Sequence, residues 1–134
     1  MLGIDYIKES IFINAKGAFS MTDPVLINLD QGVLTVTFNR PEKKNAMTNG
    51  IYDQINEAIS RAEHEAQIKV VVLTGTGDFF SAGNDIADFM TQPPEGETSP
   101  VVKLLLRLAN TDIPIVAAVN GPAIGIGTTI LLHC

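Results

Sequence analysis

The sequence predicts an α/β fold built on parallel strands. Two apolar runs, residues 69–74 and 113–119, have the composition of strands that are covered on both faces of a sheet. A glycine-rich turn follows each run, at residues 80–85 and 120–127, and helical periodicity follows each turn. Strand, turn and helix in that order are typical of right-handed crossovers, which bring both turns to the carboxyl ends of parallel strands. Ligands bind at that edge of such a sheet.

The first half of the chain supplies a hairpin and a long helix. Residues 25–29 and 33–38 are apolar or alternate around Asp30-Gln31-Gly32, so they predict two antiparallel strands joined by a tight turn. Thr48 is placed to cap a helix of about four turns. The apolar positions of this helix share one face: Ile51, Ile55, Ala58, Ile59 and Ala62.

The second half alternates helices with the second apolar run. A short helix is predicted near residues 86–90, and the three prolines within residues 91–100 predict a mobile surface loop. The second strand carries Pro114 near its start, where a missing N–H is tolerated, and helix propensity resumes at Thr128. The positions that mark the intervening helix are Val101, Leu104, Leu105 and Leu108.

One domain is predicted from residue 24 to residue 134. Residues 1–23 differ in texture, and we interpret them as an extension or a disordered leader, with Met21 able to serve as a start of its own. Cys134 is the one cysteine, so no internal disulfide and no oxidising compartment are implied. We expect a cytoplasmic protein, or one of the mitochondrial or peroxisomal matrix in a eukaryote.

Charge and hydropathy exclude two classes of partner. The net charge of −6 argues against a nucleic-acid surface, because phosphate binding needs a concentrated basic stripe. No apolar run approaches the roughly 18 residues that cross a bilayer. We therefore expect neither nucleic acid nor membrane as a partner.

The two turns have the chemistry of an oxyanion site. Gly83 lets the backbone approach a ligand and Asp85 can cap the following helix, which would leave the Ala82 N–H pointing outward. In the second turn the start of a helix leaves unpaired N–H groups, of which Ile126 is the natural donor. Two such donors would stabilise negative charge that develops on a carbonyl oxygen. The alternative is that the glycines only allow strands and helices to pack closely.

Three segments together resemble the crotonase (enoyl-CoA hydratase/isomerase) superfamily and occur in its order. They are Asn39-Arg40-Pro41 with Asn45-Ala46, residues 80–86 and residues 119–127. The resemblance covers residues 24–134 and implies the N-terminal portion of a crotonase (ClpP-like) ββα spiral fold with parallel strands, incomplete at the C-terminus. It also implies an acyl-CoA thioester as substrate, no cofactor, no metal, and a homotrimer or hexamer for the full-length protein.

The same resemblance assigns residues to the site. It makes Ala82 and Ile126 the backbone donors of an oxyanion hole that holds a thioester enolate. It makes Lys44 the contact for a CoA phosphate, whereas Arg40 and Lys43 are interpreted as solvated. The residues implied to bind substrate are Lys44, Ala46, Ser81, Gly83, Asn84, Asp85, Ile86, Gly125, Gly127 and Thr129.

One departure from the superfamily pattern bears on the reaction. Hydratases that the sequence resembles carry a glutamate where this chain has Thr129, and threonine cannot act as a general base at neutral pH. Isomerases of the superfamily take their carboxylate from later sequence, and Gly83-Asn84-Asp85 is similar to an isomerase branch. The resemblance therefore favours an enoyl-CoA isomerase of fatty-acid oxidation whose base lies outside this chain. Enoyl-CoA hydratase and a truncated, non-catalytic product are the alternatives.

The remaining candidate groups are interpreted as structural. A dinucleotide-binding turn is disfavoured because Ile130 stands where its third glycine should be. We interpret Asp85 as a helix cap, and no basic or acidic neighbour in the sequence would recruit the other groups to catalysis. Those other groups are Asp88, Glu95, His64, His133 and Cys134.

Overall fold

A four-stranded mixed sheet is the frame of the computed structural model, which describes residues 21–134. Its strands are β1 (Val25–Asp30), β2 (Val33–Phe38), β3 (Val70–Gly75) and β4 (Ile115–Ala118), in the order β1-β2-β3-β4. The first pair is antiparallel and the other two pairs are parallel. The predicted hairpin, turn and parallel strands are confirmed. The predicted leader lies outside the described residues, except for residues 21–23.

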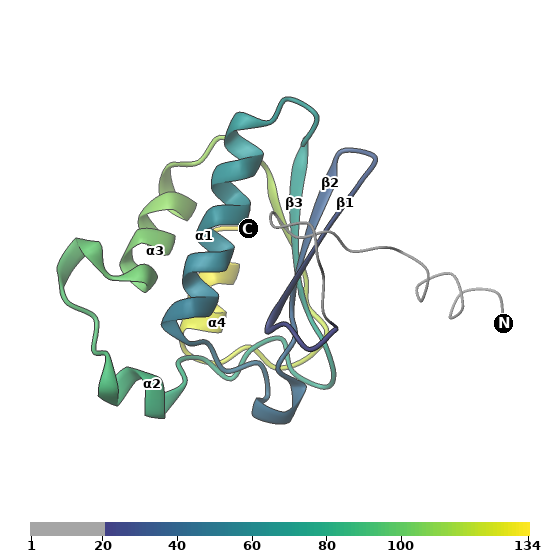
Figure 1. The fold of residues 1–134 in the computed structure, drawn as a ribbon. Coiled ribbons are helices and arrows are strands. Elements are labelled where there is room, and N and C mark those ends of the chain that lie inside the picture. The colour runs from purple at the N-terminus through teal and green to yellow at the C-terminus, as the bar shows by residue number, and fades with distance from the viewer. Residues whose placement is uncertain (1–20) are drawn as a thin grey trace, which may run out of the picture.

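Two helices cover one face of this sheet (Figure 1). Helix α1 (Asn49–His64) lies across β1, β2 and β3, and α3 (Pro100–Asn110) packs beside α1. Thr48 caps α1 as predicted, with its side-chain oxygen accepting from Ile51 N at 3.4 Å. The five apolar positions predicted for this helix are all buried.

Short elements complete the chain around the turns. They are η1 (Pro41–Lys43), α2 (Ile86–Thr91), η2 (Gly96–Thr98) and α4 (Ile126–Leu131). Helix α4 begins two residues before the predicted Thr128, because Gly125 adopts a φ of 57° that lets the chain enter the helix there. The loop before α3 is exposed from residue 91 to residue 98, as predicted, and η2 gives it one turn of regular structure.

The second apolar run is less buried than predicted. Ile115 packs into the core, but the side chains of Val116 and Val119 are 52% and 51% exposed. In β3, Val71 and Leu73 are fully buried whereas Val70 and Val72 are partly exposed. The prediction of strands covered on both faces is therefore wrong for the described residues, because α1 and α3 cover one face and β4 lies at the sheet edge.

Candidate oxyanion site

The two glycine-rich turns lie side by side at the carboxyl edge of the sheet. Phe80 N donates to Pro122 O at 3.0 Å, and Ile124 N donates to Ser81 O at 2.9 Å. Ser81 N also donates to Pro122 O, at 3.3 Å, and this bond together with that from Ile124 N forms a parallel bridge between Ser81 and Ala123. The expectation that parallel strands bring the two turns together is confirmed.

Close contact between the turns requires glycine. A Cβ on Gly83 would lie 2.9 Å from Ile124 O, which is too close. Gly125 is favoured by its φ of 57°, and a Cβ there would make an ordinary 3.9 Å contact with Gly83 Cα. Gly127, buried in α4, faces Ser81 so closely that a Cβ there would lie 3.0 Å from the serine Cβ. The packing role of these glycines is therefore real, and it places Gly83 and Gly125 next to each other.

The loop after η1 binds the first turn from its other side. Ala82 N donates to Lys44 O at 2.9 Å, Met47 N donates to Gly83 O at 2.8 Å, and Asp85 N donates to Met47 O at 2.8 Å. The Ala82 N–H thus has a partner within the protein and points away from the second turn. This bond does not fit the predicted role of Ala82, because an N–H held by one carbonyl is not free for a ligand oxygen.

Peptide geometry identifies Asn84 as the free donor of the first turn. The described peptide bonds are trans, so the C=O and N–H of one peptide unit point in opposite directions. Gly83 O faces the loop after η1, so the Asn84 N–H faces away from it. Likewise Gly125 O accepts from Thr128 N at 3.0 Å, so the Ile126 N–H points out of α4. Neither the Asn84 nor the Ile126 N–H has a hydrogen-bond partner among residues 21–134.

A simple sequence rule would have found Asn84. Ile126 directly follows Gly125, and the matching residue after Gly83 is Asn84 rather than Ala82. In both turns the glycine directs its own carbonyl toward a protein partner and so exposes the next N–H. The second predicted donor, Ile126, stays a prediction that this geometry favours.

Asn84 is also held through its side chain. Tyr52, on α1 and only 2% exposed, donates its hydroxyl to Asn84 Oδ1. Burial, with a further contribution from the negative charge of Asp88, raises the pKa of the Tyr52 hydroxyl. The hydroxyl therefore stays protonated and acts as the donor of this bond.

Arg40 ties the loop after η1 to the residue that follows Asn84. Its guanidinium donates to Ala46 O at 2.7 Å and lies 3.2 Å from the Asp85 carboxylate. Asp85 also caps α2 as predicted, accepting from Asp88 N at 3.2 Å. The hydrogen bond from Asp88 N, assisted by Arg40, holds the pKa of Asp85 below its ordinary value. Arg40 is thus an internal clamp and not the solvated cation predicted from the sequence.

Two asparagines fix the segment between β3 and the first turn. The side-chain amides of Asn45 and Asn120 both donate to Phe79 O, at 2.7 Å and 3.0 Å. Asn45 is 1% exposed and lies in the segment that carries the family resemblance. Both side chains therefore support the backbone that leads into the site.

The other predicted substrate-binding residues surround the two turns. Lys44 is exposed, with Nζ 5.1 Å from the centroid of the Phe79 ring, and Ile86 is 75% exposed at the start of α2. Ser81 is buried and donates its hydroxyl to Asn45 O at 2.9 Å, so it supports the turn from inside. Thr129 lies in α4 and donates to Gly125 O at 3.3 Å.

The carboxylates near the site are already engaged. Asp85 caps α2, and Asp88 accepts from Asn49 N at 2.8 Å, while Glu95 lies in the exposed loop. His64 and His133 are exposed, and burial raises the pKa of the Cys134 thiol.

Across residues 21–134, no three side chains of the metal-ligating types lie close enough together to hold a metal ion. Nor is any helix in this part of the chain long and apolar enough to span a bilayer.

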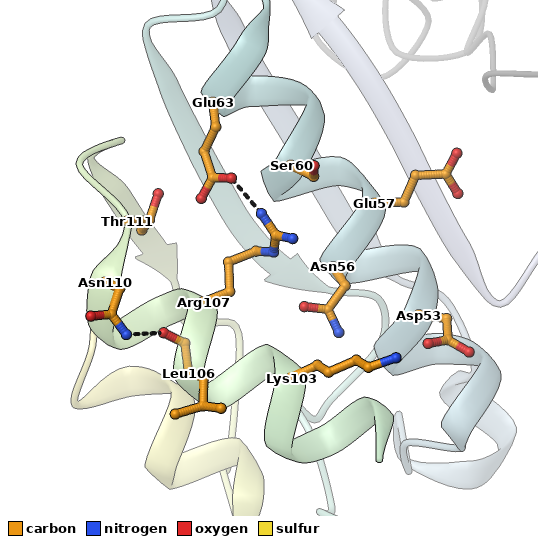
Figure 2. Close-up of a pocket in the computed structure, with 10 residues that line it drawn as sticks. All are labelled: Asp53, Asn56, Glu57, Ser60, Glu63, Lys103, Leu106, Arg107, Asn110 and Thr111. Carbon is orange, nitrogen blue, oxygen red and sulfur yellow. Dashed lines mark hydrogen bonds and ion pairs between the residues drawn. The ribbon is translucent and has the colours of Figure 1, made fainter. Parts of the chain in front are cut away.

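A separate groove of about 640 Å³ runs between α1 and α3 (Figure 2). Arg107 crosses it and pairs with Glu63, and Lys103 lies alongside with the acidic Asp53 and Glu57 nearby. None of the residues that line this groove belongs to either turn. The groove is therefore distinct from the candidate oxyanion site.

The fold and the paired turns define an α/β protein with part of the crotonase fold. The structure of OdaA from Pseudomonas aeruginosa superposes with a TM-score of 0.80 at 43% identity, over 84% of this chain and 45% of that one. An enoyl-CoA hydratase/isomerase structure from Pseudoalteromonas atlantica gives a TM-score of 0.78 at 44% identity, over 84% of this chain and 45% of that one. The predicted fold class is confirmed.

Sequence comparison gives the family. The enoyl-CoA hydratase/isomerase family matches residues 28–134, and the chain belongs to that family. It is 37% identical to human enoyl-CoA delta isomerase 2, over 81% of this chain and 29% of that protein. It is 34% identical to the probable enoyl-CoA hydratase EchA14 of Mycobacterium tuberculosis, over 82% of this chain and 44% of that protein. The chain thus spans less than half the length of these relatives.

Proposed function

We propose that this chain carries the oxyanion hole of an acyl-CoA enzyme, with Asn84 N–H and Ile126 N–H as its donors. The observation that supports this most directly is that neither N–H group has a hydrogen-bond partner within residues 21–134, and that both follow glycines whose backbones are in contact. A thioester carbonyl oxygen placed between them would accept both hydrogen bonds as it becomes an enolate oxygen. Removal of one such donor typically costs about 3–4 kcal/mol of transition-state stabilisation.

The reaction that we propose is the double-bond shift of an enoyl-CoA isomerase. A base removes a proton from the carbon next to the thioester of a 3-enoyl-CoA, the enolate is held by the hole, and the proton returns two carbons away. Thr129 supplies no carboxylate at the position where hydratases of the superfamily are expected to have one. The relatives named delta isomerases are consistent with this choice.

The general base must come from residues outside 21–134. The nearest carboxylates, Asp85 and Asp88, are occupied by hydrogen bonds to Asp88 N and Asn49 N. The pKa of Asp85 is held low, which makes it a weak base. We therefore place the base outside the described residues, in the later sequence from which related isomerases are expected to take their carboxylate.

We place the channel that would hold CoA beside the first turn. Lys44 is exposed there as a point charge for a phosphate group, and Ala46 and Ile86 supply neighbouring surface. No cofactor or metal is needed for this reaction. Assembly of the full-length protein into trimers or hexamers stays a prediction, which sedimentation velocity would test.

Amide NMR tests the choice of donors. The protein expressed from its complete gene would be titrated with a non-reactive acyl-CoA thioether and with the matching thioester. We expect the amide protons of Asn84 and Ile126 to shift with the thioester alone, since only its carbonyl oxygen can accept from them. Ala82 serves as the internal control because its N–H is bound to Lys44 O. A shift at Ala82 without one at Asn84 would contradict the assignment.

Product analysis tests the reaction. The same protein would be given a 3-enoyl-CoA and, separately, a 2-enoyl-CoA, with products separated by chromatography. Isomerase activity converts the first into the conjugated 2-enoyl-CoA. Formation of 3-hydroxyacyl-CoA at a comparable rate would favour the hydratase alternative. Acyl-CoA binding without turnover of either substrate would favour the non-catalytic one.

A further inference from the structure

Tyr52 connects the buried face of α1 to the candidate oxyanion site. Its ring packs in the core beside Ile51 and Ile55, and its hydroxyl reaches Asn84 Oδ1 at 2.5 Å. Phenylalanine would fill the same core space, so packing alone does not require the hydroxyl. What the hydroxyl adds to the packing is its hydrogen bond to Asn84.

The bond to Tyr52 fixes the orientation of the Asn84 carboxamide. A protonated phenol donates to the amide oxygen, so Oδ1 faces α1 and the NH₂ group faces the other way. The raised pKa of Tyr52, caused mainly by burial, keeps the phenol protonated throughout the neutral range. A buried hydroxyl that lost this partner would remain unsatisfied, which is costly.

Asn84 needs such an anchor because of its neighbour. Gly83 has a φ of 91° and no side chain, so the peptide unit between the two residues has unusual rotational freedom. The backbone bonds to Met47 restrain that unit from one side. The Tyr52 bond restrains Asn84 itself from the side of α1, although Asn84 is exposed.

Further hydrogen bonds join α1 and α2 near the bond between Tyr52 and Asn84. Asp88 of α2 accepts from Asn49 N at the start of α1, and the Asn49 side chain donates to Gln92 O at 3.3 Å. Together with Tyr52, these bonds tie the first turn of α1 to the segment that contains Asn84. The 16-residue helix α1 therefore holds the segment that carries the Asn84 N–H in a fixed position.

We propose that Tyr52 is a positioning residue that aims the Asn84 N–H at the thioester carbonyl oxygen. This inference rests on the proposed function. An oxyanion hole works because its donors are oriented before charge develops, so a donor that rotates loses most of its effect. Tyr52 acts through Asn84 and does not touch the substrate.

The test compares Tyr52→Phe with the parent protein, both expressed from the complete gene. Infrared difference spectra of a bound, carbonyl-labelled acyl-CoA report how strongly the hole polarises the thioester. We expect the parent to shift the carbonyl band to lower frequency and Tyr52→Phe to recover most of the free-ligand value. We expect kcat to fall by about ten- to hundredfold, with KM changed less than about twofold.

Two further variants separate positioning from stability. Thr74→Val removes a hydroxyl that donates to Ala118 O in the sheet, so it should lower stability without moving the carbonyl band. Asn84→Ala keeps the backbone N–H and removes the acceptor of Tyr52. If Tyr52 acts through Asn84, adding Tyr52→Phe to Asn84→Ala produces no further change in the band.

The outcomes are distinguishable. A parent-like band in folded Tyr52→Phe overturns the positioning role and leaves the proposed function intact. A band that moves equally in Thr74→Val also overturns it, since the effect would then be one of general stability. A parent protein that binds acyl-CoA without shifting the band overturns the oxyanion hole itself, and the role of Tyr52 with it.

Discussion

At the scale of single residues, the site depends on which peptide units turn their N–H groups outward. Gly83 and Gly125 each direct a carbonyl to a protein partner, and the N–H of the following residue has no partner in the part of the chain that the structure describes. Ala82 lies two positions before Asn84, and its N–H donates to Lys44 O. In each turn, the hydrogen bond that the glycine carbonyl accepts therefore determines which backbone N–H faces outward.

Gly83 should tolerate no side chain. Alanine there would place Cβ 2.9 Å from Ile124 O, at a φ of 91° that L residues rarely adopt. We expect Gly83→Ala to lower the free energy of unfolding by about 2–3 kcal/mol, measured by urea denaturation. Gly50→Ala is the control, because Gly50 is exposed in α1 with its nearest neighbour 3.8 Å away. It should be neutral or stabilising by up to about 1 kcal/mol. Equal losses in the two variants would contradict the packing argument.

The residue type at position 129 should determine the ratio of hydrated to isomerised product. In the proposed isomerase, Thr129→Glu places a carboxylate where the related hydratases are expected to have their base. We expect the ratio of hydrated to isomerised product to rise by about tenfold or more, measured by chromatography of the acyl-CoA products. Thr128→Glu makes the same charge change on a neighbouring exposed residue of α4 and should leave the ratio unchanged.

At the scale of elements, three chain segments converge on the first turn. The loop after η1 holds it on one side, the second turn holds it on the other, and α1 reaches it through Tyr52. Arg40 closes this arrangement by bridging Ala46 O and Asp85. The geometry of the donors is therefore a property of the assembly of segments and not of one turn.

The Asp85 contacts predict how stability depends on pH. The folded-state pKa of Asp85 is held below its unfolded value by Asp88 N and Arg40, so its ionised form stabilises the fold. That contribution is fully present above the unfolded pKa of about 3.9 and is lost as the pH falls through the folded pKa. We expect Asp85→Asn to flatten the acid limb of a plot of unfolding free energy against pH. A limb that is equally steep in the variant would refute this contribution.

At the scale of the whole molecule, β4 is an edge strand of the described sheet, and apolar side chains on and near it are exposed to solvent. Val116 and Val119 are about half exposed, and Leu132 is 80% exposed near the end of α4. The chain spans less than half the length of the relatives named above. An edge strand flanked by apolar side chains favours association with another segment or chain.

This surface should make the 134-residue chain self-associate. We expect its sedimentation coefficient to increase with concentration and the double change Val116→Thr, Val119→Lys to suppress the increase. Leu106→Lys is the control, because Leu106 is 46% exposed on α3 and lines the groove between α1 and α3 rather than belonging to β4. A concentration-independent coefficient for the parent chain would show that the edge does not mediate association.

The sequence by itself determined the elements, their order, the buried face of α1, the two turns and the family. These follow from local periodicity and from the positions of glycines. Both patterns can be recognised from neighbouring residues in the sequence, without knowledge of the rest of the fold. Only the tertiary structure decided that the Ala82 N–H is bound to Lys44 O and that the Asn84 N–H has no partner among the described residues. It also decided that Arg40 is a clamp and that Tyr52 reaches the site. Each of these depends on contacts between residues far apart in the chain, such as Ala82 with Lys44 and Tyr52 with Asn84. The glycine positions mark the two turns, but the direction of each peptide N–H is set by the partner that the carbonyl of the same peptide unit finds, and that partner lies elsewhere in the fold for Gly83.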